Sequence, residues 1–140
     1  MELIKTKLLN PKNKLPQRTT FHIFMSASLK YRTAHFYKHY FEIFYEAQRE
    51  EVKAKIIWTI KGIEAVERIP TSYVKHIEGT NGLYEMRIKF GTDIFRIFCF
   101  FDKGKLIILA NGFQKKTQKT PVQEILKALK IKREYEDENK

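Results

Sequence analysis

Residues 83–121 read LYEMRIKF-GTD-IFRIFCFF-DKG-KLIILANGFQKKTQKTP, and they carry the main evidence for the fold. This stretch contains three runs rich in aromatic and β-branched residues, which is the composition typical of β-strands. Residues 91–93 and 102–104 separate the runs, and the glycine in each can adopt the positive φ that tight turns require. We therefore predict an antiparallel meander of three strands.

The three predicted strands differ in how polar their faces are. In the first strand, apolar residues alternate with Glu85, Arg87 and Lys89, so one face packs and the other meets water or a ligand. The second strand, residues 94–101, is apolar on both faces apart from Arg96. Such a pattern is typical of a central strand, and the third strand is also largely apolar.

Helices are predicted on either side of the meander. Seven apolar residues recur at helical spacing upstream of it: Phe41, Phe44, Tyr45, Val52, Ile56, Ile60 and Ile63. They indicate one long helix or two helices joined near residues 48–51, and the aromatic residues 34–40 indicate a strand that pairs with the meander. A last helix is predicted with Thr120 as N-cap and Pro121 at its first position, fraying after Ile131.

Length and charge suggest the domain organisation and a class of partner. The chain has 140 residues, the size of one domain, and a net charge of +11. This charge favours a polyanionic partner, nucleic acid ahead of an anionic membrane, although many basic proteins have no such partner. We predict a domain over residues 34–132, a flexible basic extension over residues 1–33 and a charged tail over residues 133–140. The extension could be an arm that touches RNA or a partner, a disordered leader, or sequence upstream of a start at Met25.

Several classes of protein are not supported. Cys99 is the only cysteine, so no intrachain disulfide can form, and its apolar strand predicts a core position. No apolar run approaches the roughly 18 residues of a membrane span, and no secretory signal is visible, so we expect a cytoplasmic protein without membrane association. No cofactor-binding motif appears. His35 and His39 lack a third ligand, so we expect neither a cofactor nor a metal site.

Two arginines are the first candidates for chemistry. A charge inside the apolar run around Arg96 is costly to bury without a partner. Arg96 could pair with an acid such as Glu85 or extend to the rim, or it could face a polar cleft and bind phosphate through its planar set of donors. Strand pairing could place Arg87 beside it on the same face, although a solvated strand face is the simpler interpretation of Arg87 alone.

A basic segment follows the third predicted strand and adds further candidates. Lys115, Lys116 and Lys119 have no acidic neighbour there, and lysines converging with two arginines would bind a nucleic-acid backbone. A lysine in that setting could abstract a proton while an arginine stabilises a pentavalent phosphate. We predict catalytic roles for Arg87, Arg96, Lys115 and Lys116, and RNA binding by Lys75, His76, Lys89 and Lys119. A lone loop histidine is, however, most often simply exposed.

The same stretch closely resembles the C-terminal half of HigB-like toxins, the phage-derived branch of the RelE/ParE superfamily. The matching features are LYEMR at residues 83–87, FRIF at residues 95–98, GFQKKTQKTP at residues 112–121, and Glu124. The resemblance covers about residues 34–132. It implies a small α+β fold: a twisted, mostly antiparallel sheet with an N-terminal helical hairpin on one face and a C-terminal helix.

The resemblance also implies a function. Such proteins are toxins of type II toxin–antitoxin pairs, and RelE-like members cut mRNA in the ribosomal A site without a metal ion. By motif, Arg87 and Arg96 would hold the scissile phosphate, and Lys115 or Lys116 would add charge or act as the base. Some members place a tyrosine or histidine near the C-terminus, for which Tyr135 is the remaining candidate.

Partners and alternatives follow from the same resemblance. A cognate antitoxin, of the helix-turn-helix kind, and mRNA on the ribosome are the expected partners. One alternative is a ParE-like toxin that inhibits DNA gyrase without cutting RNA. Another is an inactive relative that only binds its antitoxin. Fold alone does not choose among them, because one fold can serve several activities.

Overall fold

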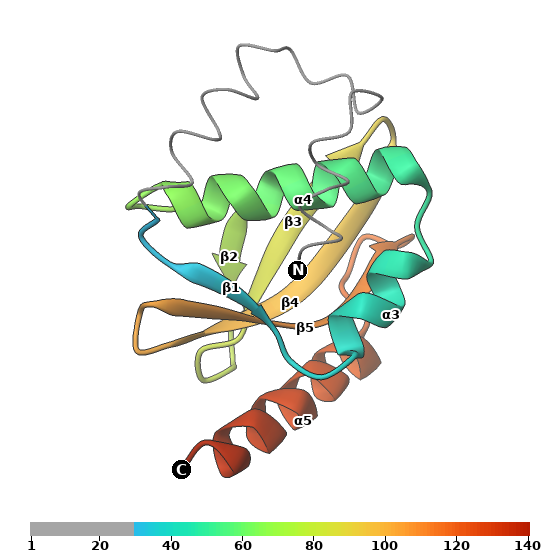
Figure 1. Ribbon diagram of the computed structural model, residues 1–140. Coiled ribbons are helices and arrows are strands. Elements are labelled where there is room, and N and C mark those ends of the chain that lie inside the picture. Colours follow the sequence, from blue (N-terminus) through green and yellow to red (C-terminus); the bar gives the residue numbers. More distant parts are fainter. Residues whose placement is uncertain (1–29) are drawn as a thin grey trace.

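The computed structural model describes residues 30–140, and the predictions for residues 1–29 lie outside that range. Five strands form one sheet with helices on both of its faces, which confirms the predicted α+β class (Figure 1). The elements in chain order are β1 (Thr33–Phe36), α3 (Tyr40–Glu46), α4 (Glu50–Ala65), β2 (Val74–His76), β3 (Tyr84–Phe90), β4 (Asp93–Asp102), β5 (Leu106–Lys115) and α5 (Val122–Glu138).

The predicted meander is present and forms the middle of the sheet. The strand order is β1-β5-β4-β3-β2, so β4 is the central strand, as its two apolar faces indicated. The strands β2 to β5 pair in antiparallel fashion, and β1 adds to β5 in parallel. Gly91 and Gly104 have φ values of 61° and 73° in the two turns of the meander, where a side chain would be strained.

Two apolar layers cover the two faces of the sheet. The first lies between the sheet and helices α3 and α4, and we name this side the helix-pair face. It contains all seven apolar residues whose spacing predicted helices, together with Met86, Ile97 and Cys99. The second layer lies under α5 and includes Phe98, Ile108 and Ile131, and we name this side the α5 face. The central strands β4 and β5 are therefore covered on both faces.

The structure resolves or corrects several details of the helices and of β1. The segment of residues 41–63 forms two helices, which answers the question that periodicity left open. The strand predicted over residues 34–40 ends at Phe36. Thr120 does not cap the last helix, because Pro121 is its N-cap, with an extended ψ of 130° and no side-chain capping bond. None of the helices within residues 30–140 has the length and apolarity to cross a membrane.

The expectation that the chain frays after Ile131 is wrong. Helix α5 continues to Glu138, and Tyr135 is buried with its hydroxyl donating to Asp102 Oδ2 at 2.6 Å. The adjacent Glu134 accepts a hydrogen bond from the Tyr40 hydroxyl, and Glu138, about one turn later, accepts one from the Tyr37 hydroxyl. Glu134, Tyr135 and Glu138 are therefore held by partners from distant parts of the sequence.

Candidate active site

Arg87 and Arg96 lie directly opposite one another on neighbouring strands. The register of β3 and β4 pairs them, and Phe113 of β5 continues the row. Because Met86 and Ile97 point to the helix-pair face, the alternation of side chains directs both arginines to the α5 face. The predicted proximity of the two arginines is therefore confirmed.

A cleft of about 460 Å³ contains this pair, and we name it the arginine cleft. Its lining residues come from α4, β3, β4 and the segment before β2: Lys55, Thr59, Ser72, Tyr73, Arg87, Ile88, Lys89, Ile94 and Arg96. It follows the edge of β3 beyond β2, which pairs only with residues 84–86. The N–H of Arg87 donates to the Tyr73 carbonyl at 2.8 Å, and this bond holds the segment before β2 against the edge.

A second cleft, also about 460 Å³, adjoins the first, and we name it the lysine cleft. It is lined by Ile94, Lys115, Lys116, Thr117 and Gln118. Ile94 lines both clefts, and the sheet register places it between Lys89 and Lys115. Two of the predicted lysines thus line a cleft beside that of the arginine pair, and we name the two clefts together the cationic track, whose charges suit a phosphate backbone.

Arg96 is held by an acid and also reaches the arginine cleft. Its Nε lies 2.8 Å from Glu85 Oε2, a close ion pair whose geometry is not aligned for a hydrogen bond, and its Nη1 donates to the Phe95 carbonyl at 3.1 Å. Burial lowers the pKa of Arg96; the charge of Glu85 raises it, and the charge of Arg87 lowers it further. The guanidinium stays charged at neutral pH. The predicted pairing with Glu85 is thus confirmed and Arg96 also lines a cleft, whereas phosphate binding by Arg96 stays a prediction.

Arg87 is the less restrained of the two arginines. Its side chain is only partly buried, yet its Nε is enclosed and has no hydrogen-bond partner within residues 30–140. An enclosed donor without an acceptor is unfavourable unless a ligand or water supplies one. This side chain is therefore ready to bind an anion that enters the cleft.

The other predicted site residues do not all lie close to the two arginines. Lys75 pairs with Glu85 across β2 and β3, so it lies on the α5 face near the site. His76 pairs with Tyr84 on the helix-pair face, where its Nε2 lies 3.0 Å from the Thr80 carbonyl, so the structure does not join it to the arginines. Lys119 is exposed in the segment between β5 and α5, beyond the lysine cleft.

Tyr135, the candidate for the family's C-terminal tyrosine, does not lie near the two arginines. It packs at the opposite end of β4, where it contacts Phe100 and donates to Asp102. Burial raises the pKa of Tyr135 to about 12, and the hydrogen bond to Asp102 raises it too. A phenol that ionises so reluctantly, and so far along the strand, cannot act as base on a ligand of Arg96.

Sequence reasoning missed the wall of the arginine cleft that α4 and the segment before β2 provide. Lys55 and Thr59 come from α4, and Ser72 and Tyr73 precede β2. Helical periodicity could have indicated that Lys55 lies outside the main apolar stripe, but no local pattern shows which strand edge a helix will meet. Packing of α4 across the sheet brings these residues to Arg87.

A comparison with protein families bears on this geometry. The family model described as Phage derived protein Gp49-like (DUF891) matches residues 44–133. The chain belongs to this family. The Gp49-like proteins form part of the RelE/HigB-like toxin superfamily. Neither the curated proteins nor the solved structures contain a match to the chain.

The matched range of this Gp49-like chain includes the whole cationic track. It runs from α3 through the meander into α5, and it contains Arg87, Arg96, Lys115 and Lys116. Chemically, the track offers cationic donors from three strands and the segment after β5, with Glu85 as the acid paired to Arg96. Such an arrangement can bind a phosphodiester and stabilise extra negative charge on it.

Proposed function

We propose that this Gp49-like protein is the toxin of a type II toxin–antitoxin pair, that it cuts mRNA on the ribosome, and that a cognate antitoxin neutralises it. The observation that supports this most is the direct pairing of Arg87 with Arg96 beside an open cleft. The lysine cleft, which shares Ile94 with the arginine cleft, supports the proposal because its lysines could contact further phosphates of an RNA backbone. Membership of a toxin-like family supports the biological role.

The proposed reaction is an attack within the RNA strand. The ribose 2′-oxygen forms a bond to the neighbouring phosphorus and loses its proton, while the bond from phosphorus to the 5′-oxygen breaks and that oxygen gains a proton. The products are a 2′,3′-cyclic phosphate and a 5′-hydroxyl end. Arg87 and Arg96 stabilise the charge that accumulates on the phosphate oxygens, and Lys115 or Lys116 serves as the base or adds charge.

Mapping of mRNA 5′ ends after induction tests the proposal. The wild type should produce new 5′-hydroxyl ends within coding sequences, and Arg87→Ala should abolish them. Arg87 is the better residue to replace, because removing Arg96 leaves Glu85 without its partner. Lys103→Ala, in the turn between β4 and β5, is a control of equal charge change away from the clefts.

Two outcomes would contradict the proposed nuclease activity. Growth arrest by the wild type with unchanged transcripts would remove it, and a DNA supercoiling assay would then test the gyrase-inhibiting alternative. Absence of any toxicity on induction would favour the inactive relative. The proposed antitoxin is tested by co-expression of the toxin with the product of a gene adjacent to its own. A true antitoxin should restore growth and co-purify with the toxin.

A further inference from the structure

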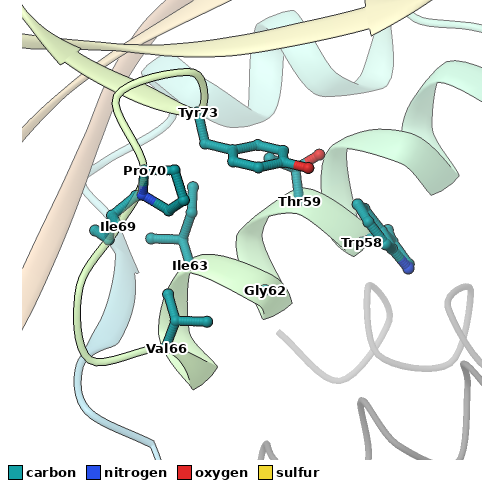
Figure 2. Close-up of a pocket in the computed structure, with 8 residues that line it drawn as sticks. All are labelled: Trp58, Thr59, Gly62, Ile63, Val66, Ile69, Pro70 and Tyr73. Carbon is teal, nitrogen blue, oxygen red and sulfur yellow. The ribbon is translucent and has the colours of Figure 1, made fainter.

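An apolar pocket lies next to the arginine cleft, between α4 and the segment that leads to β2 (Figure 2). Its volume is about 200 Å³, and we name it the aromatic pocket. Trp58 and Tyr73 form two of its sides, and Gly62 lies about one turn after Trp58 on α4. None of its lining residues carries a charge, so the pocket is unsuited to a phosphate and suited to a flat apolar group.

The aromatic pocket and the arginine cleft are neighbours. Thr59 and Tyr73 line both of them. Lys55, which lines the arginine cleft, places its Nζ 4.8 Å from the centre of the Trp58 ring. Thr59 of α4 and Tyr73 beside β3 therefore form the boundary between an aromatic site and a cationic site.

A nucleotide has the chemistry that matches this combination. It joins a planar aromatic base to a phosphate through one sugar, so its two parts must bind in adjoining sites. Proteins commonly hold single-stranded RNA by stacking unpaired bases on aromatic side chains while cations bind the backbone. We propose that the aromatic pocket binds one RNA base, stacked against Trp58 or Tyr73, while the phosphate attached to the same nucleotide lies in the arginine cleft. This inference rests on the proposed function and adds a subsite that would influence where the RNA is cut.

Gly62 allows the pocket to be filled without disturbing the core. A Cβ added at Gly62 would meet no heavy atom within 4 Å, so a larger side chain would extend into the open space of the pocket. Gly62 lies inside α4, where any other ordinary residue favours the helix more than glycine does. Gly62→Leu should therefore block the pocket in a fully folded protein, and Gly62→Ala is the matched control that leaves most of the space open.

Binding of two single-stranded probes to the full chain tests the subsite. One probe is a fluorescein-labelled 2′-O-methyl RNA hexamer, which cannot be cut, and the other is the same backbone with abasic sugars. The wild type should bind the first about tenfold more tightly, because stacking of one base contributes roughly 5- to 150-fold in affinity. Trp58 is the only tryptophan in the chain, so its fluorescence should be quenched by the first probe and not by the abasic one.

The variants should separate base binding from phosphate binding. Gly62→Leu and Trp58→Ala should lose the tenfold preference, whereas Gly62→Ala and Trp58→Phe should keep most of it. Arg87→Ala should weaken both probes by a similar factor; if it weakens neither, the proposed phosphate site fails independently of the aromatic pocket. The subsite is overturned if the wild type shows no preference and no quenching, or if Gly62→Leu keeps the preference. It is also overturned if Gly62→Leu impairs only neutralisation by the antitoxin, since the occupant is then a protein.

Discussion

At the residue scale, Arg96 and Arg87 should differ in what they contribute to stability. Arg96→Ala leaves the carboxylate of Glu85, whose side chain is 13% exposed, without its partner. We expect the free energy of unfolding to fall by about 2–4 kcal/mol, toward the range measured when one partner of a buried pair is removed. Arg87→Ala should lower it by less than about 1 kcal/mol, because Arg87 Nε has no partner within residues 30–140.

Urea denaturation of the two variants measures this difference. Adding Glu85→Gln to Arg96→Ala should recover part of the loss, since the unpaired charge is then removed. Equal midpoints for Arg96→Ala and Arg87→Ala would show that the Glu85 pair contributes no stability.

Tyr135 should make stability depend on alkaline pH. Burial and the Asp102 hydrogen bond raise the pKa of Tyr135 to about 12, whereas an unfolded tyrosine has a pKa of about 10. Because the folded value is raised, the contribution is complete below pH 10 and is lost as the pH rises through 12. Tyr135→Phe lacks this group, so the advantage of the wild type over Tyr135→Phe, about 1–3 kcal/mol at pH 8, should shrink above pH 10. A constant difference between pH 8 and pH 11 in urea titrations would contradict the assignment.

At the element scale, two glycines should respond in opposite directions to the same substitution. Gly112 of β5 lies under α3, and a Cβ there would come within 2.5 Å of the Phe44 ring. Gly112→Ala should therefore separate α3 from the sheet and lower the free energy of unfolding by about 1–3 kcal/mol. Gly62→Ala should raise it by about 1 kcal/mol, because the added methyl group meets open space and favours the helix. Thermal unfolding measures both, and a Gly112→Ala variant as stable as the wild type would refute the close packing of α3 on β5.

At the scale of the whole molecule, the charge distribution matters more than the net charge of +11. If the lysine cleft follows the RNA backbone, the double variant Lys115→Ala and Lys116→Ala should reduce the salt dependence of RNA binding. The slope of log affinity against log salt should become shallower by about 1.4, at roughly 0.7 for each lost phosphate contact on a single strand. Lys103→Ala with Lys105→Ala removes the same charge at the other end of β5 and should leave the slope unchanged. Equal slopes for the two double variants would show that binding follows net charge alone.

The local sequence pattern predicts much of the placement of the site residues, for physical reasons. Alternation along β3 and short glycine turns predict that Arg87 and Arg96 meet, because a hairpin with one buried face has only one register that suits it. In β2 the same alternation places His76 on the face opposite to the two arginines. This strand has only three residues, so its sequence does not show which side chains point to which face. The helix to Glu138 was missed because its partners, Tyr37, Tyr40 and Asp102, lie 33 or more residues away.

Before any coordinates, the amino-acid order predicted strands and helices with a central apolar strand, a core position for Cys99 and two arginines that strand pairing could bring together, since these follow from side-chain period and turn chemistry between neighbours in the chain; the α+β fold followed from the family resemblance. Two features depended on packing between distant elements: the wall that α4 adds to the arginine cleft, and the aromatic pocket beside it. Periodicity indicates which side of a helix is buried, but the place where that helix crosses the sheet is set by how side chains from separate segments fit together.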